Sequence, residues 1–341
     1  MKIVWLSPFG DGWSLAYRLR EAGHKVVYVP LNGTRNGEGF LPILSPDENW
    51  QVYSKKADVT FVDATPASRR TRRSYEPSEL SFELARLRHQ GVPLIGPSPT
   101  SELVQNDPRY FRKTLKRFGI NAQVPELVEP SLHLFASFGP FGQAALVVRG
   151  PGFDAVLPVQ AHNSAPHLRL SGLQGFLAET HHSSYVHAEF VPVAEDFHIV
   201  RILTEPLYPA VFHLFGDLLG TSLLARYPDV YEGRYQEPPR AFGLAVTFHR
   251  LQEEPSGPWD ELLDVPGFFG GELHRTDGDH SKAEAHGLVP GALIGGDMQW
   301  GELTGKVQRE AKRVADLSGW SFELNGLDDV PALIQQYGGH E

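Results

Sequence analysis

The sequence predicts an α/β and α+β protein, with an N-terminal doubly wound parallel-sheet domain followed by a two-lobed α+β region. Three observations support this prediction. The first hundred residues alternate short apolar runs with amphipathic segments, which is typical of βαβ units. From Val124 onwards, frequent prolines and short β-type runs replace that alternation. The chain has 341 residues, of which 41% are hydrophobic, so it is long enough for two or three packed lobes.

The expected elements fall into three segments. Residues 1–98 form the N-terminal domain, residues 99–183 the linker helices and first lobe, and residues 184–341 the second lobe. Apolar runs predict strands at residues 2–6, 24–30, 58–64, 92–95, 144–150, 184–193, 197–203, 208–216 and 320–325. Helical spacing of apolar residues predicts helices at residues 13–23, 77–91 and 304–319. Gly23 and Gly91 end the first two of these helices.

Composition and charge exclude several classes of function. The absence of cysteine removes thiol nucleophiles, disulfides and zinc–thiolate sites. The net charge of −10 argues against binding nucleic acid by general electrostatics, although the basic loop SRRTRR (68–73) leaves a phosphorylated or nucleic-acid ligand open. No signal-peptide pattern or apolar run of membrane-spanning length is present, so we expect a cytoplasmic protein with no membrane partner. The oligomeric state does not follow from the sequence.

The 15 histidines and the serines show no known catalytic spacing. His181, His182 and His187 cluster, as do His274 and His280, but neither group has a metal-ligand spacing such as H-E-x-x-H. The Gly-x-Ser-x-Gly elbow of serine hydrolases is absent.

The most informative segment is GVPLIGPSPTSELVQNDPRYFRKTLKRFGI, residues 91–120. It joins a strand, a Gly-Pro-Ser turn, a short helix, an Asp-Pro break and a basic helix that ends in Gly-Ile. This order resembles the ATP-grasp ligases, and most closely phosphoribosylamine–glycine ligase. Weaker similarity extends to LVVRG (146–150), HAEFVPVAEDFHIVRIL (187–203) and SFELNG (321–326). The resemblance implies an ATP-grasp-like two-lobed region that uses ATP and Mg²⁺ to join a small carboxylate and an amine through an acyl-phosphate.

The resemblance also implies phosphate-binding cations. Arg109 and Arg149 stand where the family has lysines, and Lys113 matches the second lysine of its K-x-F-x-K helix. Arg201, in the third block of similarity, completes the set of catalytic candidates. We expect Arg109 to point into a cleft between the lobes; the alternative is that the basic helix is simply a solvated face.

Nucleotide and metal contacts follow in the same way. AEFV (188–191) resembles the hinge, so the carbonyl of Glu189 and the amide of Val191 would contact adenine, and Glu195, with Asp196 adjacent, would bind ribose. The alternative is an edge strand followed by an acidic turn. Glu323 and Asn325 match the E-x-N metal motif, whose oxygen ligands suit Mg²⁺. In a rival alignment SFEL is an earlier strand and the metal motif is absent.

The chain departs from the family at several positions. The segment RGPGFDAVLPVQ (149–160) has Gly150 and Gly152 but lacks the glycine-rich loop and its lysine, and Ala188 replaces an acidic residue. In the N-terminal turn SPFGDGW, Gly10 and Gly12 would be second-substrate contacts or a tight βα turn. Two functions therefore remain open: an ATP-dependent carboxylate–amine ligase, or a degenerate relative without turnover that serves as a nucleotide-binding or structural component of an assembly. A glycosyltransferase-like α/β protein would account for the N-terminal half but not for residues 96–120.

Overall fold

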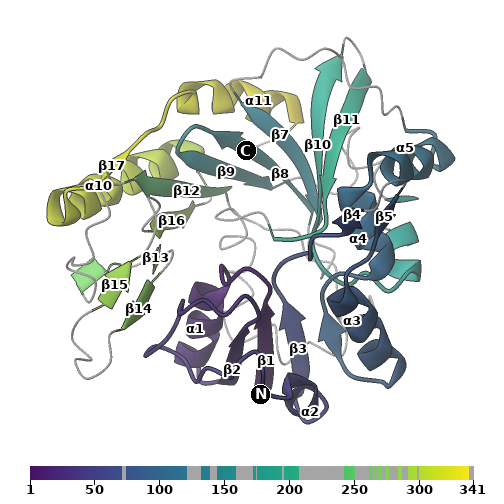
Figure 1. The fold of residues 1–341 in the computed structure, drawn as a ribbon. Helices are drawn as coiled ribbons and strands as arrows, with labels where there is room; N and C mark the ends of the chain where they lie inside the picture. Colours follow the sequence, from purple (N-terminus) through teal and green to yellow (C-terminus); the bar gives the residue numbers. More distant parts are fainter. Residues whose placement is uncertain are drawn as a thin grey trace.

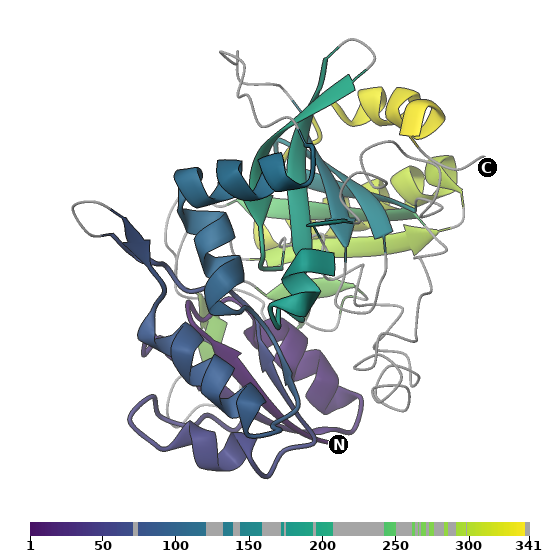
Figure 2. The same ribbon diagram turned by 90° about the vertical axis from the view of Figure 1, so that its right-hand side faces the viewer.

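A computed structural model gives the fold (Figures 1 and 2). It describes residues 1–70, 74–120, 132–138, 144–158, 172–173, 175–193, 196–206, 242–249, 261–262, 265, 267–270, 273–275, 283–285, 291–297 and 299–337. The expected strand at residues 208–216 lies outside these residues.

The N-terminal domain is a parallel sheet with the strand order β2-β1-β3-β6. Its strands are β1 (Lys2–Ser7), β2 (Lys25–Pro30), β3 (Val59–Val62) and β6 (Leu94–Ile95), and its helices are α1 (Trp13–Glu21), α2 (Trp50–Ser54) and α3 (Glu79–His89). Ile3 and Trp5 pack in the core that contains α1, whereas Val4 and Leu6 pack in the core that contains α2 and α3. Helices therefore cover both faces, which is why β1 is apolar on both sides. The strands and helices predicted for residues 1–98 are confirmed.

Two capped helices connect this domain to the rest of the chain. In α4 (Pro99–Asn106), the hydroxyl of Ser98 caps the helix by accepting a hydrogen bond from the amide of Ser101, and the hydroxyl of Ser101 accepts one from the amide of Ser98. In α5 (Pro108–Arg117), the side chain of Asp107 accepts hydrogen bonds from the first free amides. Proline occupies the first helical position in both, where its missing N–H costs nothing. The predicted turn–helix–break–helix order is confirmed.

A large antiparallel sheet forms the second part. Its strand order is β11-β10-β7-β8-β9-β12-β16-β13, with β17 paired to β12. The strands are β7 (His133–Phe138), β8 (Ala144–Gly150), β9 (Phe153–Pro158), β10 (Val186–Val193), β11 (Asp196–Leu203), β12 (Phe242–His249), β13 (Phe268–Gly270), β16 (Gly291–Asp297) and β17 (Ser321–Phe322). Two small hairpins, β4–β5 (Arg69–Arg70, Tyr75–Glu76) and β14–β15 (Leu273–Arg275, Ala283–Ala285), lie outside it.

Two helices pack on one face of the large sheet. They are α10 (Trp300–Ser318) and, after the short helix η1 (Leu327–Asp329), α11 (Val330–Tyr337). Trp300 of α10 contacts the ring of Phe242 on β12, and Tyr337 of α11 contacts the ring of Phe190 on β10. Helix α10 starts four residues before the predicted position, and the predicted strand at 320–325 is limited to Ser321–Phe322.

The strands of the two expected lobes belong to one sheet. The strands β7, β8 and β9 come from the expected first lobe, yet they lie between β10 and β12 of the expected second lobe. Over the residues described, the mixed architecture of a parallel and a large antiparallel sheet is confirmed, but the division into two separate lobes is not.

Gly152 fixes the C-terminal segment against the β8–β9 turn. Its φ is +77°, and a Cβ built there would lie 2.5 Å from the carbonyl oxygen of Glu323. We expect Gly152→Ala to lower the free energy of unfolding by at least about 3 kcal/mol, because strain and overlap add. Gly119 is the matched control: its φ is +67° but nothing lies within 4 Å, so Gly119→Ala should cost only about 1–2 kcal/mol. Urea unfolding of both variants measures the difference, and equal losses would contradict this packing.

Candidate functional site

A row of charged side chains crosses five adjacent strands of the large sheet. It consists of Arg201 on β11, Glu189 on β10, His133 on β7, Arg149 on β8 and Asp154 on β9, and we call it the polar row. Arg201 pairs in register with Glu189, and Arg149 pairs with both His133 and Asp154. Successive residues of a strand point to opposite faces. The polar row therefore lies on the face opposite Phe190, away from α11.

Arg149 and Asp154 form a bidentate ion pair. The guanidinium Nε and Nη2 donate to the two carboxylate oxygens at 2.7 Å each. The Asp154 side chain is 1% exposed and that of Arg149 32%. Burial lowers the pKa of Arg149, but the hydrogen bonds and charge of Asp154 raise it by more. A buried bidentate ion pair is costly to break, so the pair with Asp154 holds Arg149 beside β9.

Glu189 joins the other two members of the row. One carboxylate oxygen lies 2.6 Å from Nδ1 of His133, and the other lies 3.0 Å from Nε of Arg201. The backbone of Glu189 has strands on both sides, paired with Phe135 on β7 and Arg201 on β11. Val191 pairs only with His198 of β11 among the described strands. The backbone edge expected to contact adenine is thus more accessible at Val191 than at Glu189.

Nearer the N-terminal end of β10, the side chain on the same face as Glu189 is fully buried. His187 accepts or donates a hydrogen bond at Nδ1 with the hydroxyl of Ser137, at 2.7 Å. Burial, and secondarily the charge of Arg149, lowers the pKa of His187 to about 3, so the imidazole is neutral. The ring of Tyr185 stacks on it at 5.7 Å. This column of side chains connects the polar row to the junction with the N-terminal domain.

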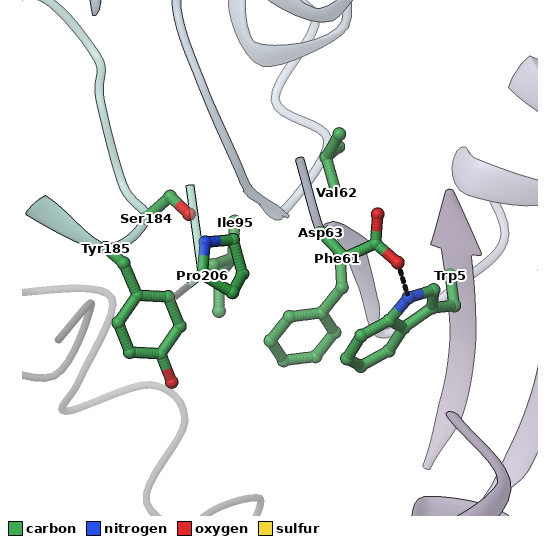
Figure 3. Close-up of a pocket in the computed structure, with 8 residues that line it drawn as sticks. All are labelled: Trp5, Phe61, Val62, Asp63, Ile95, Ser184, Tyr185 and Pro206. Atoms are coloured by element: carbon green, nitrogen blue, oxygen red, sulfur yellow. Dashed lines mark hydrogen bonds between the residues drawn. The ribbon is translucent and has the colours of Figure 1, made fainter. Parts of the chain in front are cut away.

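A small apolar pocket lies at that junction (Figure 3). The N-terminal sheet contributes a residue from within β1 and residues at the carboxyl ends of β3 and β6, and the second part contributes residues that flank β10 and β11. The lining residues are Trp5, Phe61, Val62, Asp63, Ile95, Ser184, Tyr185 and Pro206. None of these residues is among the site residues predicted from the sequence. The signal that could have found Asp63 is a carboxylate directly after a buried parallel strand, where ligands commonly bind.

Asp63 is the carboxylic acid among the lining residues and is 3% exposed. The indole N–H of Trp5 donates to Oδ2 at 2.7 Å, and Oδ1 has no hydrogen-bond partner in the described part of the chain. Burial raises the pKa of Asp63 to about 7; hydrogen bonds from Trp5 and Ser7 oppose the shift, and the charge of Asp11 adds to it. A Cβ at Gly12 would overlap Oδ2, so only glycine fits beside this carboxyl group.

The N-terminal glycines are thereby explained as packing positions. Gly10 has φ +85°, and a Cβ there would overlap the side chain of Thr34. Gly12 lies against Asp63, whose charge would oppose a phosphate. The tight-turn interpretation therefore accounts for both glycines.

The predicted metal residues lie next to the β8–β9 turn. Glu323 and Asn325 are exposed, and the amide of Asn325 lies 3.4 Å from the carboxylate of Glu323. Their oxygen atoms fit Mg²⁺, which accepts one or two protein ligands and takes the rest from phosphate and water. Among the residues described, no group of three or more His, Cys, Asp or Glu side chains could hold a metal by itself.

The remaining predicted residues lie apart from the polar row. Arg109 and Lys113 are exposed on α5, which lies beside the β11 edge of the sheet (Figures 1 and 2), and β10 and β7 separate that edge from β8. Their assignment to phosphate stays a prediction. Glu195 lies outside the described residues, and Asp196 begins β11. Arg69 and Arg70 are exposed on a small hairpin.

Comparison with known proteins supports the fold. No protein-family model and no curated protein sequence matches the chain. Phosphoribosylamine–glycine ligase from Thermotoga maritima has a similar structure, with a TM-score of 0.56, 13% identity, and coverage of 95% of this chain and 98% of that one. N5-carboxyaminoimidazole ribonucleotide synthetase from the same organism has a TM-score of 0.53 and 14% identity, with coverage of 91% of this chain and 98% of that one. Biotin carboxylase from Campylobacter jejuni has a TM-score of 0.55 and 11% identity, with coverage of 94% of this chain and 92% of that one.

These similarities confirm that the chain has the fold of ATP-grasp enzymes, in a divergent form. At identities of 11–14% they establish the fold alone. Within the described residues, no helix is both long and apolar enough to span a membrane.

The raised pKa of Asp63 predicts a pH-dependent stability. The folded chain holds this proton up to about pH 7, whereas the unfolded chain loses it near 3.8, so the free energy of unfolding falls as pH rises through that window. We expect Asp63→Asn to remove this fall in the free energy of unfolding. The change in that free energy caused by the substitution should therefore be more stabilising at pH 8 than at pH 4.5, by about 2–4 kcal/mol. Asp11 shares the titration, because its charge acts on Asp63.

Urea unfolding at the two pH values measures this difference. Asp316→Asn makes the same change on the exposed face of α10 and should shift the free energy of unfolding by less than about 0.5 kcal/mol at either pH. A pH-independent effect of Asp63→Asn would show that the carboxyl group is not buried as described.

Proposed function

We propose that this chain is an ATP-dependent carboxylate–amine ligase that works through an acyl-phosphate, with the nucleotide bound along the polar row. One observation carries the proposal: Arg149, from one block of sequence similarity, lies in one row on one face of the sheet with Glu189 and Arg201, which come from another. The fold shared with ATP-grasp enzymes supports it.

Each group in the proposed site has a role set by its chemistry. Arg149 and Arg201 bind the phosphates, and the backbone of β10 at Glu189 and Val191 borders adenine. Arginine can hold two phosphate oxygens at once, so the replacement of lysine changes geometry without removing charge. The ribose contact is assigned to Glu195 and Asp196.

Glu323 and Asn325 would hold Mg²⁺, which when bound would neutralise the phosphate charge that repels an incoming carboxylate. The substrate carboxylate attacks the terminal phosphorus and ADP leaves. The amine then attacks the carbonyl carbon of the acyl-phosphate, and phosphate leaves as the amide bond forms.

The charge balance of the polar row limits this proposal. Two arginines face two carboxylates, those of Asp154 and Glu189, so the row has no net charge when His133 is neutral. A triphosphate needs a cationic site. Arg149 must therefore exchange Asp154 for phosphate when ATP binds. A degenerate, non-catalytic relative is the second candidate. In that case Arg149 would stay paired with Asp154 and would not be available to bind phosphate.

Removing the competing charge tests whether Arg149 binds phosphate. Asp154→Asn keeps the size of the side chain and one acceptor oxygen but releases Arg149 from its ion pair. We expect the affinity for ATP with Mg²⁺ to rise about tenfold, roughly 1.4 kcal/mol, and the affinity for AMP to change much less. Calorimetric titration with both nucleotides measures this.

The control for this titration is Glu310→Gln, which breaks an exposed pair with Arg313 on α10 and should leave both affinities unchanged. If neither wild type nor Asp154→Asn binds ATP, the nucleotide assignment fails. ATP binding without turnover would instead favour the degenerate relative.

Removing one predicted metal ligand tests turnover. Glu323 is exposed, so Glu323→Gln should leave the free energy of unfolding within about 0.5 kcal/mol of wild type. It should abolish Mg²⁺-dependent release of ADP, measured with a panel of amino acids and amines as co-substrates. Asp328→Asn, an exposed carboxylate change in η1, is the control and should retain activity. Unchanged ADP release in Glu323→Gln would remove the metal assignment.

A further inference from the structure

His133 is the member of the polar row to which the proposed function gives no role. It stands on β7, the strand between β10 and β8 (Figure 1), and pairs in register with Arg149. Neighbouring strands lie about 5 Å apart, so His133 is one strand from Arg149 and two strands, roughly 10 Å, from Arg201. The imidazole therefore lies between the two arginines that are assigned to the phosphates of ATP.

The ring of His133 is accessible on the face where the nucleotide is placed. Its side chain is 39% exposed, whereas that of its carboxylate partner Glu189 is 11% exposed. The guanidinium of Arg149 lies 6.0 Å from the ring of Phe135, a buried residue two positions after His133 and on the same face of β7. A ligand that binds Arg149 from this face would therefore lie beside the His133 ring.

Glu189 decides which nitrogen of the ring is available. Its Oε1 lies 2.6 Å from Nδ1 of His133, and its Oε2 accepts from Nε of Arg201 at 3.0 Å. An ionised carboxylate can only accept hydrogen bonds, so Nδ1 carries a proton and donates it to Glu189. Nε2 has no hydrogen-bond partner in the described part of the chain. It is the nitrogen that can contact a ligand.

The protonation state of Nε2 decides whether this contact attracts or repels a phosphate group. In a neutral ring whose Nδ1 carries the proton, Nε2 is an acceptor, and a phosphate oxygen is also an acceptor. In the imidazolium, Nε2 donates, and the hydrogen bond to phosphate is charge-assisted. A neighbouring carboxylate favours the charged ring, and so does a bound phosphate. Histidine is the side chain that gains and loses its charge near neutral pH, so nucleotide binding can drive this proton uptake.

The elements around β7 surround His133 with more carboxylates than arginines. His187, on the same face of β10, is neutral because burial lowers its pKa to about 3. A Cβ built at Gly326 would contact both Leu132, which precedes β7, and the carboxylate of Asp329. The charged groups that face this region are Arg149 on β8, Asp154 on β9, Glu189 on β10, Arg201 on β11 and Asp329 of η1. This set favours a positive ring over a neutral one.

We propose that His133 is a third phosphate-binding residue of the polar row, which takes up a proton when ATP binds and donates a hydrogen bond from Nε2 to a phosphate oxygen. Glu189 is the positioning residue that holds the ring through Nδ1. This step rests on the proposed function, since it requires ATP along the polar row. The proton comes from solvent, and no bond of ATP changes. The imidazolium supplies positive charge that the row lacks when its ion pairs are closed.

Proton uptake can be measured directly on the full chain. Calorimetric titration with ATP and Mg²⁺ in two buffers of different ionisation enthalpy gives the number of protons bound per ATP. Wild type should take up more protons than His133→Asn, whose amide can still donate to Glu189 but cannot become charged. The ATP affinity of wild type should fall at least about fivefold from pH 6.5 to pH 8.5, and that of His133→Asn about twofold at most. Comparing the two proteins removes the proton exchange of ATP itself.

Two further variants separate charge from structure. His133→Lys places a permanent cation at the same position, so at pH 8.5 it should bind ATP more tightly than His133→Asn and without the pH dependence of wild type. A residue with a purely structural role would lose affinity equally in both variants, and that result would contradict the proposal. His89→Asn changes an exposed histidine in the last turn of α3 and is the control; it should keep the proton uptake of wild type.

NMR of the His133 ring in wild type gives a second measurement that stands even if a variant does not fold. The nitrogen-15 signal of Nε2, assigned by correlation with the β7 backbone, reports directly whether this nitrogen carries a proton. At pH 7.5 it should move towards the protonated form when ATP and Mg²⁺ saturate the chain, and stay unchanged with adenosine, which lacks phosphate. An Nε2 signal that does not respond to saturating ATP would overturn the proposal.

The outcomes distinguish this inference from the ligase proposal. If ATP binds with equal proton uptake in wild type and His133→Asn, the nucleotide site stands and the role of His133 fails. If wild type does not bind ATP, both proposals fail. If ATP binds with a proton uptake that depends on His133 but without turnover, the role of His133 stands and the degenerate relative is favoured over the ligase.

Discussion

The register of the central antiparallel strands is the constraint on which the site depends. With β10, β7, β8 and β9 paired as observed, Phe190 and its neighbours in register face α10 and α11, and the polar row faces the other way. A one-residue slip would invert every side chain of a strand. Glu189 or Asp154 would then be buried against apolar helices, which costs several kcal/mol for an unpaired charge. The hydrophobic face thus fixes the position of the charged one.

The polar row is internally neutralised, since Asp154 and Glu189 balance Arg149 and Arg201. In this account the neutral row prevents a strong cationic surface in the absence of nucleotide, and phosphate binding requires one ion pair to exchange partners.

Much of the local structure was predictable from the sequence. Ser98 and Asp107, each followed by proline, specify the starts of α4 and α5 through local hydrogen bonds. The site was only partly predictable, because its partners come from distant strands. Asp154 follows the glycine turn after Arg149 and carries no sign that it will pair with that arginine. Asp63 became interpretable only when strand order placed it beside Trp5, and the single sheet across both expected lobes rests on long-range pairing such as β9 with β12.

The central claim is that Arg149 leaves Asp154 to bind the phosphates of ATP. It is tested most directly by the NMR signal of the Arg149 Nε–H, followed during titration of the wild-type chain with ATP and Mg²⁺. The account predicts a saturable shift of this signal with ATP and a much smaller shift with AMP, because only ATP offers the terminal phosphates that replace the carboxylate. An Arg149 signal that stays unchanged at saturating ATP would contradict the account, since the ion pair with Asp154 would then remain closed with nucleotide bound.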